Sequence, residues 1–112
     1  MIELIYIEHL SEALNVPVYA ERPAENIPDA YVVIDNTGTS KSQHIYSSTV
    51  AFQSYGKSLL EAAELNDTVI AAVEQSIERN DIVRVALNSA YNFTDTAAKA
   101  YRYQAVFDII HY

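Results

Sequence analysis

Gly56, Lys57 and Ser58 form the part of the sequence closest to a nucleotide-binding motif. A phosphate-binding loop has the form G-x-x-x-x-G-K-[ST], in which glycines let backbone N–H groups surround the phosphates and the lysine reaches the terminal ones. Ala51 stands where the first glycine would be required, and the residues that follow it alternate as in a strand. We therefore expect no nucleotide binding at this stretch.

Ser58 and Glu61 explain the same stretch in another way. They stand three positions apart, which is the spacing of a capping box, where the two side chains satisfy backbone N–H groups at the start of a helix. We predict that Ser58 caps a following helix, that Gly56 makes the turn from strand to helix, and that Lys57 is solvated.

The other residues with catalytic or metal-binding potential show no arrangement that supports chemistry. His9, His44 and His111 are far apart in the sequence and lack the short ligand spacings of a metal site. There is no G-x-S-x-G motif to expose a nucleophilic serine, and the chain has no cysteine. Four carboxylates near the first loop lack the spacing of a calcium loop; they are Glu21, Glu25, Asp29 and Asp35. We predict no catalytic residue, no cofactor, no metal and therefore no enzyme.

Composition and charge argue against several classes of partner. The chain has 112 residues, with 15 acidic and 7 basic side chains and a net charge of -8. Its basic residues are scattered, whereas nucleic-acid binding needs clustered Lys and Arg to displace counterions. No apolar run approaches the roughly 18 residues of a membrane span, and the acidic N-terminus is unlike a signal peptide. We expect one soluble domain over residues 1–112, made inside the cell, that binds neither nucleic acid nor membrane.

The hydrophobic periodicity predicts the elements that position these residues. Helical spacing covers residues 2–14, ending before Pro17, and a second helix covers residues 59–79. Strands are predicted at residues 16–20, 30–35, 44–55, 83–93 and 101–112. The predicted fold is α+β, in the order α-β-β-β-α-β-β, with two helices packed on one face of a mainly antiparallel sheet.

Alternation in the last two strands predicts which side chains share a face. One strand should place a common set on one face: Val83, Val85, Leu87, Tyr91 and Phe93. The final strand should place a second set on one face, beside the core residue Phe107: Tyr101, Tyr103, Ala105, Phe107 and Ile109. On its opposite face, Val106, Ile110 and Tyr112 form an apolar strip, which either another subunit or the rest of the monomer would cover.

The polar segment from Asn36 to Gln43 is predicted to be a loop. It is long for the connection between two strands, and such loops either are mobile or serve as contact elements. Together with the apolar strip of the last strand, it supplies the predicted oligomer or partner contacts. These are Thr37, Ser40, Lys41, Gln43, Val106, Ile110 and Tyr112.

The order of elements over nearly the whole chain resembles the tail-terminator proteins, also called tail-completion or head-to-tail joining proteins, of long-tailed bacteriophages and prophages. The resemblance rests on the segments VPVYAERP, DAYVVID, SSTVAFQSYGKSLLEAAEL and YRYQAVFDIIHY. It implies a structural subunit that forms a ring, commonly hexameric, at the end of the tail tube, stops tube growth and joins tail to head. The implied partners are copies of the chain, the major tail tube protein and head-connector proteins. The implied location is the host bacterial cytoplasm during assembly and then the tail–head junction of the virion.

Two other interpretations remain open. In the same setting, the chain is compatible with a neck or connector protein on the head side, or with a subunit of a defective phage-like particle. In a different class, it is compatible with a small intracellular ligand-binding domain, because domains of a sheet and helices host many functions.

Overall fold

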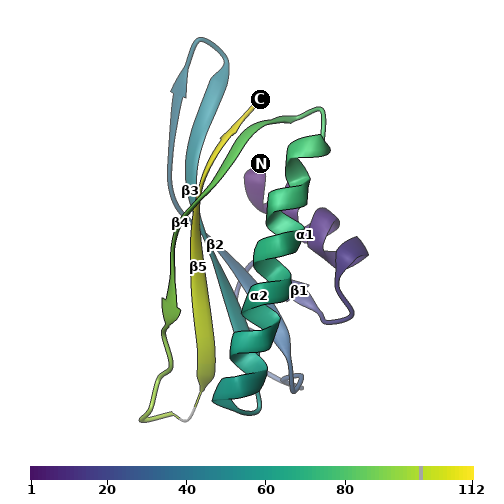
Figure 1. Ribbon diagram of the computed structural model, residues 1–112, viewed down its shortest axis with the longest axis vertical. Coiled ribbons are helices and arrows are strands. Elements are labelled where there is room, and N and C mark those ends of the chain that lie inside the picture. The colour runs from purple at the N-terminus through teal and green to yellow at the C-terminus, as the bar shows by residue number, and fades with distance from the viewer. Residues whose placement is uncertain (99) are drawn as a thin grey trace.

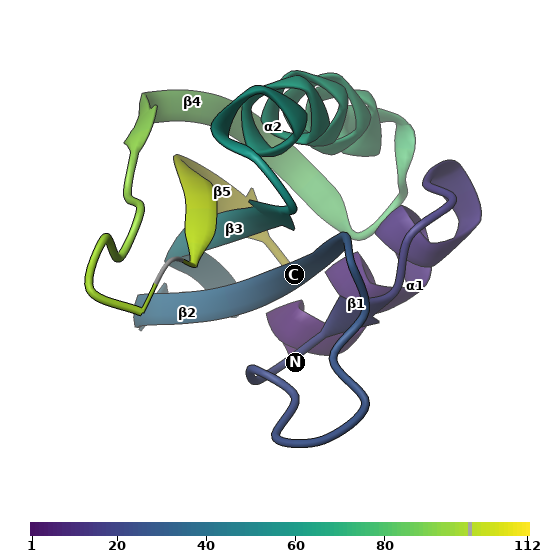
Figure 2. The same ribbon diagram turned by 90° about the horizontal axis from the view of Figure 1, so that it is seen from below.

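A five-stranded sheet runs along the molecule, and two helices lie on one side of it (Figures 1 and 2). The computed structural model describes residues 1–98 and 100–112. The helices are α1 (Ile2–Ala13) and α2 (Leu59–Gln75), and the short 3-10 helix η1 (Ser76–Glu78) follows α2. The strands are β1 (Val18–Tyr19), β2 (Tyr31–Ser42), β3 (Ile45–Gly56), β4 (Ile82–Asn92) and β5 (Tyr101–His111). The predicted α+β class and element order are confirmed.

The last strand of the chain, β5, lies inside the sheet. The strand order is β1-β2-β3-β5-β4, with β1 parallel to β2 and the other neighbours antiparallel. The sheet is therefore mixed and mainly antiparallel, as predicted. β1 is shorter than the predicted strand and pairs with β2 only at Val32 and Val33. The edges of the sheet are consequently β4 on one side and, beyond β1, the second half of β2 on the other.

The loop predicted at Asn36–Gln43 is wrong, because most of it belongs to β2. The strand pairs with β3 as far as Ser42 and Ile45, and Gln43 and His44 form the turn with φ angles of 51° and 69°. Two successive residues with positive φ are typical of a tight β-hairpin turn. This half of β2 is exposed and polar on both faces, so it lacks the alternation that marks a half-buried strand. The hairpin extends beyond the helices in Figure 1.

The core lies between the helices and the inner face of the sheet, which we define as the face toward α1 and α2. Tyr6 of α1 meets Phe52 of β3 edge-to-face with 5.3 Å between ring centroids, and Phe52 meets Phe107 of β5 at 5.7 Å. The Tyr6 hydroxyl lies 2.7 Å from the Ser76 hydroxyl oxygen, and burial raises the pKa of Tyr6 to about 12. The core thus joins the first helix to the central strands and to the end of the second helix.

The faces predicted for the final strand and for β4 have different outcomes. In β5, Ala105, Phe107 and Ile109 are buried toward the helices, as predicted, whereas Tyr101 and Tyr103 are only half-buried. The common face predicted for β4 is wrong, because Leu87 pairs with Phe107 on the inner face and Tyr91 pairs with Gln104 on the opposite face. Register shifts occur between Ile82 and Arg84 and between Leu87 and Ser89. Each bulge adds a residue to β4 and reverses the alternation beyond it.

Candidate functional site

The Gly-Lys-Ser stretch forms the start of α2. Ser58 is the N-cap, and its hydroxyl accepts a hydrogen bond of 3.2 Å from the Glu61 backbone N–H, as predicted. The Glu61 carboxylate accepts a 3.2 Å bond from the N–H of Lys57, one residue before the position expected in a capping box. The Lys57 ammonium is exposed and forms a surface ion pair of 3.1 Å with Asp29. These residues therefore serve the helix start.

Gly56 is the last residue of β3, paired with Tyr101, so it ends the strand and does not form the predicted turn into α2. No side chain fits at this position. A Cβ atom at this position would lie 2.7 Å from the Ala62 backbone nitrogen and 3.1 Å from the Glu61 side chain. Any other residue would push the strand away from the first turn of the helix. Close packing thus accounts for the glycine of the motif.

The outer face of the sheet, opposite the helices, has two different ends. At the end near the turn into α2, Tyr31 and Tyr55 stack with 4.4 Å between ring centroids and 7° between ring planes. Tyr19 meets Tyr31 edge-to-face at 6.0 Å, and both Tyr31 and Tyr55 are buried. Two cations, Arg22 and Arg102, stand over the Tyr55 ring. We call this region the aromatic end of the outer face.

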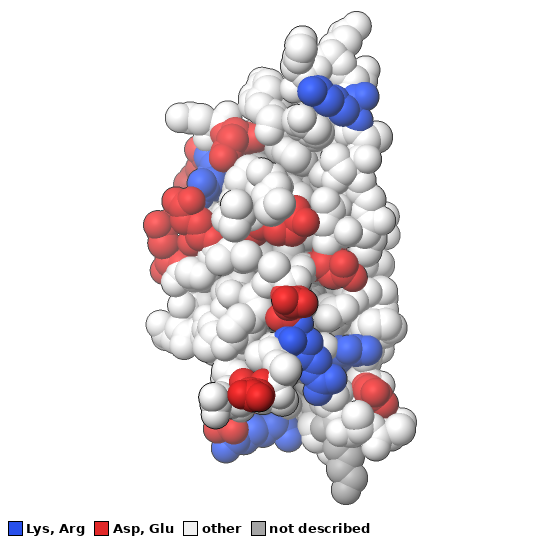
Figure 3. Space-filling view, turned by 180° about the vertical axis from the view of Figure 1, so that it is seen from behind, with Lys and Arg blue, Asp and Glu red and all other residues white. Residues whose placement is uncertain are grey.

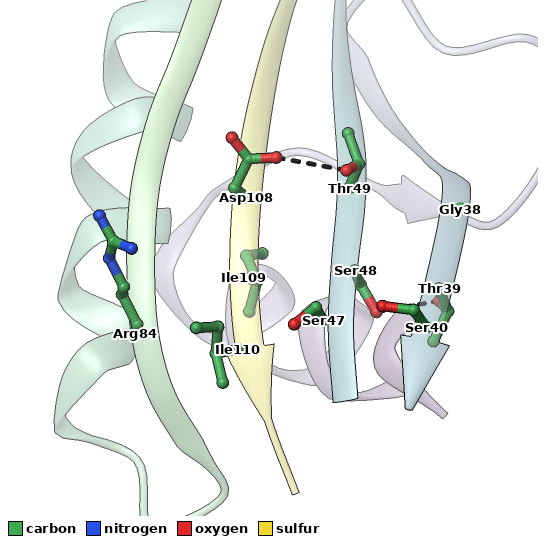
Figure 4. A pocket seen from close by; sticks show the side chains of 10 residues that line it. All are labelled: Gly38, Thr39, Ser40, Ser47, Ser48, Thr49, Arg84, Asp108, Ile109 and Ile110. Atoms are coloured by element: carbon green, nitrogen blue, oxygen red, sulfur yellow. Dashed lines mark hydrogen bonds between the residues drawn. The ribbon is translucent and has the colours of Figure 1, made fainter. Parts of the chain in front are cut away.

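The other end of the outer face is a groove of about 420 Å³, which we call the outer groove. Figure 4 shows the side chains that line it, which come from four neighbouring strands. Ser40, Ser47, Ile110 and Arg84 pair in sequence across β2, β3, β5 and β4. The side chains of β2 and β3 here are small, and Gly38 has no atom within 4 Å of where its Cβ would be. The outer groove forms because these small side chains lie beside the larger Ile110 and Arg84.

Asp108 is the acidic residue of the outer groove. Its carboxylate accepts hydrogen bonds from the Thr49 hydroxyl at 3.2 Å and from the Asn88 side-chain amide at 3.0 Å. Arg84, on the neighbouring strand, is exposed and forms no ion pair with the residues that the structure describes. The groove therefore presents one carboxylate that is already hydrogen-bonded and one guanidinium that is available to a partner.

The structure brings some of the predicted contact residues together. Ser40 and Ile110 both line the outer groove, and Val106 is half-buried on the same face, paired with Ala51 and Ser89. Thr37 is exposed at the bulge of β2, where its hydroxyl donates a 3.0 Å hydrogen bond to a backbone carbonyl of β3. This part of the prediction identified the outer face, although the loop that was expected to contribute to it is a strand.

The remaining predicted contacts lie elsewhere. The Lys41 ammonium stands 5.1 Å from the centroid of the Tyr46 ring, which stacks on His111 at 5.3 Å. Gln43 is in the hairpin turn. Tyr112 does not share the outer groove with Ile110, because β5 ends before it and it lines a second groove, of about 470 Å³, beside α1. The predicted set is thus divided between two surfaces.

The side chains of Ser48 and His111 are buried and lie within hydrogen-bonding distance of each other. The Ser48 hydroxyl lies 2.7 Å from Nε2 of His111 and 2.9 Å from the Thr39 hydroxyl. Nδ1 of His111 lies 3.3 Å from the main-chain oxygen of Tyr112, so this contact is to the main chain and not to an Asp or Glu side chain. Both side chains are buried, and their contact joins the end of β5 to the hairpin.

Sequence analysis missed the aromatic end of the outer face. Arg22 and Arg102 are far apart in the chain, and Tyr31 and Tyr55 meet only through the pairing of β2 with β3. The unusual number of tyrosines, nine in all, was the one available signal. It could not locate the cluster without the strand register.

Comparisons with protein-family models and with curated proteins found no match to this sequence. The interpretation of the site therefore depends on its geometry. Within residues 1–98 and 100–112, no group of three His, Cys, Asp or Glu side chains is placed to hold a metal ion. In that same part of the chain, the helices are too short or too polar to cross a membrane.

Proposed function

We propose that this chain is a structural phage protein that assembles with copies of itself into a ring at the end of the tail tube, as tail-terminator proteins do. The observation that supports this most is the outer face of the sheet. A sheet exposed on one side usually carries polar residues on that side. Here Val106 and Ile110 are half-buried on the outer face beside an open groove, so the surface suits a protein partner.

A ring of identical subunits needs two different surfaces on each copy. In such a heterologous interface, one surface of a subunit contacts another surface of the next until the ring closes. The outer face is the first surface in this proposal. A dilute subunit is expected to be monomeric if one contact is weak, because the tail tip supplies the local concentration that completes the ring.

The proposal includes no catalysis and places the protein in the host bacterial cytoplasm during assembly and then in the virion. Burial of Ser48 and His111 supports the absence of catalysis, since a nucleophilic serine has to reach its substrate. A ligand-binding domain has less support, because ligand sites bury most of a small molecule. The outer groove instead lies along one side of a sheet. A head-side connector would use the same ring contact.

Particles that carry Ile110→Lys test this function. The change places a charge in the outer groove, and we expect a folded subunit that yields unattached heads and tails of abnormal length under the electron microscope. Leu4→Lys is the matched control, because Leu4 is 61% exposed on α1 and lies outside the outer face. Joined, normal particles from folded Ile110→Lys would remove this face from the interface. Normal particles from a complete deletion would refute the function.

A further inference from the structure

The helical layer and the outer face differ in charge. α1 carries three carboxylates, α2 four and η1 one, which makes eight, and these segments contain no Lys or Arg. Four of the carboxylates follow each other at helical spacing on the exposed side of α2 and η1: Glu64, Asp67, Glu74 and Glu78. We call them the carboxylate stripe. In the part of the chain that the structure describes, none of them forms an ion pair.

Two guanidinium groups converge on one tyrosine at the aromatic end of the outer face. The central carbons of Arg22 and Arg102 lie 5.4 Å and 5.8 Å from the centroid of the Tyr55 ring. Nη1 of Arg102 donates to the Tyr55 hydroxyl at 2.9 Å, and its Nε donates to the Phe93 carbonyl oxygen at 2.7 Å. Nε of Arg22 donates to the Tyr31 hydroxyl at 3.3 Å. We call Arg22, Arg102, Tyr31 and Tyr55 the arginine–tyrosine cluster.

The arginine–tyrosine cluster holds two positive charges, and several of their N–H donors form no hydrogen bond with the residues that the structure describes. A guanidinium has five N–H donors, and the bonds above use one of Arg22 and two of Arg102. Neither forms an ion pair with a carboxylate among the described residues, although Asp95 acts on Arg22 through space. The hydrogen bond to Tyr31 is the largest of the effects that raise the pKa of Arg22. A guanidinium stays protonated in proteins, so both groups carry a positive charge beside aromatic rings and are available to an anion.

Figure 3 shows the side of the molecule opposite to the view of Figure 1. Asp and Glu lie along one flank of this side, and further Asp and Glu side chains lie among the Lys and Arg groups of its lower part. The same chain therefore carries a pair of guanidinium groups among tyrosines on the sheet and a stripe of carboxylates without Lys or Arg on α2 and η1. They lie on opposite layers, so one copy cannot bring its own two surfaces together.

We infer that the arginine–tyrosine cluster receives the carboxylate stripe of a second copy of this chain. Tyr and Arg are the residue types enriched at the energetic centres of interfaces, and planar guanidinium groups bind carboxylates through paired hydrogen bonds. Joining the sheet side of one copy to the helix side of the next is a head-to-tail contact, which closes into a ring. The inference rests on the proposed function and identifies the second surface of its interface.

Two charge-reversal variants test the inference, with self-association measured by analytical ultracentrifugation at low salt. The first variant, Arg22→Glu with Arg102→Glu, makes the cluster acidic, and the second, Glu64→Lys with Asp67→Lys, makes the stripe basic. Each variant alone should associate about tenfold more weakly than the wild type or worse, because like charges then meet in the contact. Glu12→Lys, at an exposed position of α1 outside both surfaces, is the control for a charge change and should associate like the wild type.

Mixing the two variants gives the decisive result. In an equimolar mixture, the unchanged stripe of the first variant meets the unchanged cluster of the second, and the two reversed surfaces attract each other. Association should therefore return to nearly the wild-type level. Arg22→Glu alone, at an exposed loop position, repeats the first test if the double variant does not fold.

The remaining outcomes separate this inference from the proposed function. Wild-type association that survives both reversals, or a mixture that stays dissociated, would overturn the inference and leave the ring in place. Wild-type protein that stays monomeric at millimolar concentration and on isolated tails would refute the proposed function and the inference with it. Binding of a duplex oligonucleotide that depends on Arg22 and Arg102 would assign the cluster to nucleic acid instead.

Discussion

The inner face of the sheet buries its side chains against the protein's own helices, whereas the outer face is closed by aromatic packing at one end and forms a groove at the other. On the inner face, Phe52 and Phe107 are fully buried. On the outer face, Val106 and Ile110 remain half-buried. Folding therefore depends on the inner face and leaves much of the outer face available to a partner. Substitutions on the two faces should consequently affect different measurements.

The largest effect on stability should come from the inner face. Phe52→Ala removes a buried ring that contacts both Tyr6 and Phe107, and we expect the free energy of unfolding to fall by about 3–5 kcal/mol. Val106→Ala on the outer face should lower it by about 1 kcal/mol, because its side chain is only half-buried. Chemical denaturation measures both, and equal losses would contradict the division between the faces.

Tyr6 gives the inner face a dependence on alkaline pH. Its pKa is about 12 in the folded protein against the ordinary 10.0, because burial disfavours the phenolate. A pKa that folding raises contributes stability below the unfolded pKa, and this contribution is lost as pH rises from about 10 to about 12. Tyr6→Phe should therefore lose less stability than the wild type between pH 9 and about pH 11. Identical pH profiles in urea denaturation would show that Tyr6 ionises freely.

The start of α2 should have a smaller effect. Ser58→Ala removes the acceptor for the Glu61 N–H and should lower the free energy of unfolding by about 1 kcal/mol, while Ser58→Asp should be nearly neutral. Lys57→Ala breaks only an exposed ion pair and should change little. Titration calorimetry with ATP or GTP and magnesium tests the alternative that this stretch binds phosphate. Micromolar binding that Lys57→Ala abolishes would support nucleotide binding and contradict the helix-capping role.

The smallest signal that we expect is in an assay of nucleic-acid binding. The net charge is -8, and the two guanidinium groups of the arginine–tyrosine cluster are few compared with the phosphates that a DNA-binding surface neutralises. We expect no mobility shift of duplex DNA at physiological salt and low micromolar protein. A shift with steep salt dependence would mean that the outer face recognises phosphate rather than a protein surface.

Elements with regular periodicity were predictable from the sequence, and those with bulges or polar faces were not. The final strand has no register shift, so the burial of Ala105, Phe107 and Ile109 followed from its alternation. The half-buried Tyr101 and Tyr103 and the buried Gln104 did not follow from it. β4 contains two register shifts, which no alternation rule anticipates. The second half of β2 carries polar residues on both faces, so its sequence predicts a loop where the structure has a strand. Its residue Ser40 still proved to share the outer groove with Ile110.

The arginine–tyrosine cluster lay beyond sequence reasoning for a different reason. Arg22 belongs to a loop, Arg102 to β5 and Tyr55 to β3, so only the folded chain brings them together. Because Arg22 and Arg102 are far apart in the sequence, the sequence gives no sign that their side chains meet. Charge clusters formed by long-range contacts require the strand register before they can be recognised.

Protection of a single cysteine at position 47 tests most directly whether the outer face packs against another copy. The chain has no cysteine of its own, and Ser47 is exposed in the outer groove. Thiol-labelling rates of Ser47→Cys would be compared between dilute monomer and assembled rings, with exposed Ser11→Cys on α1 as the control. We predict that assembly slows labelling at position 47 and leaves position 11 unchanged. Equal labelling rates at position 47 in monomer and ring would contradict the packing of the outer face against another copy.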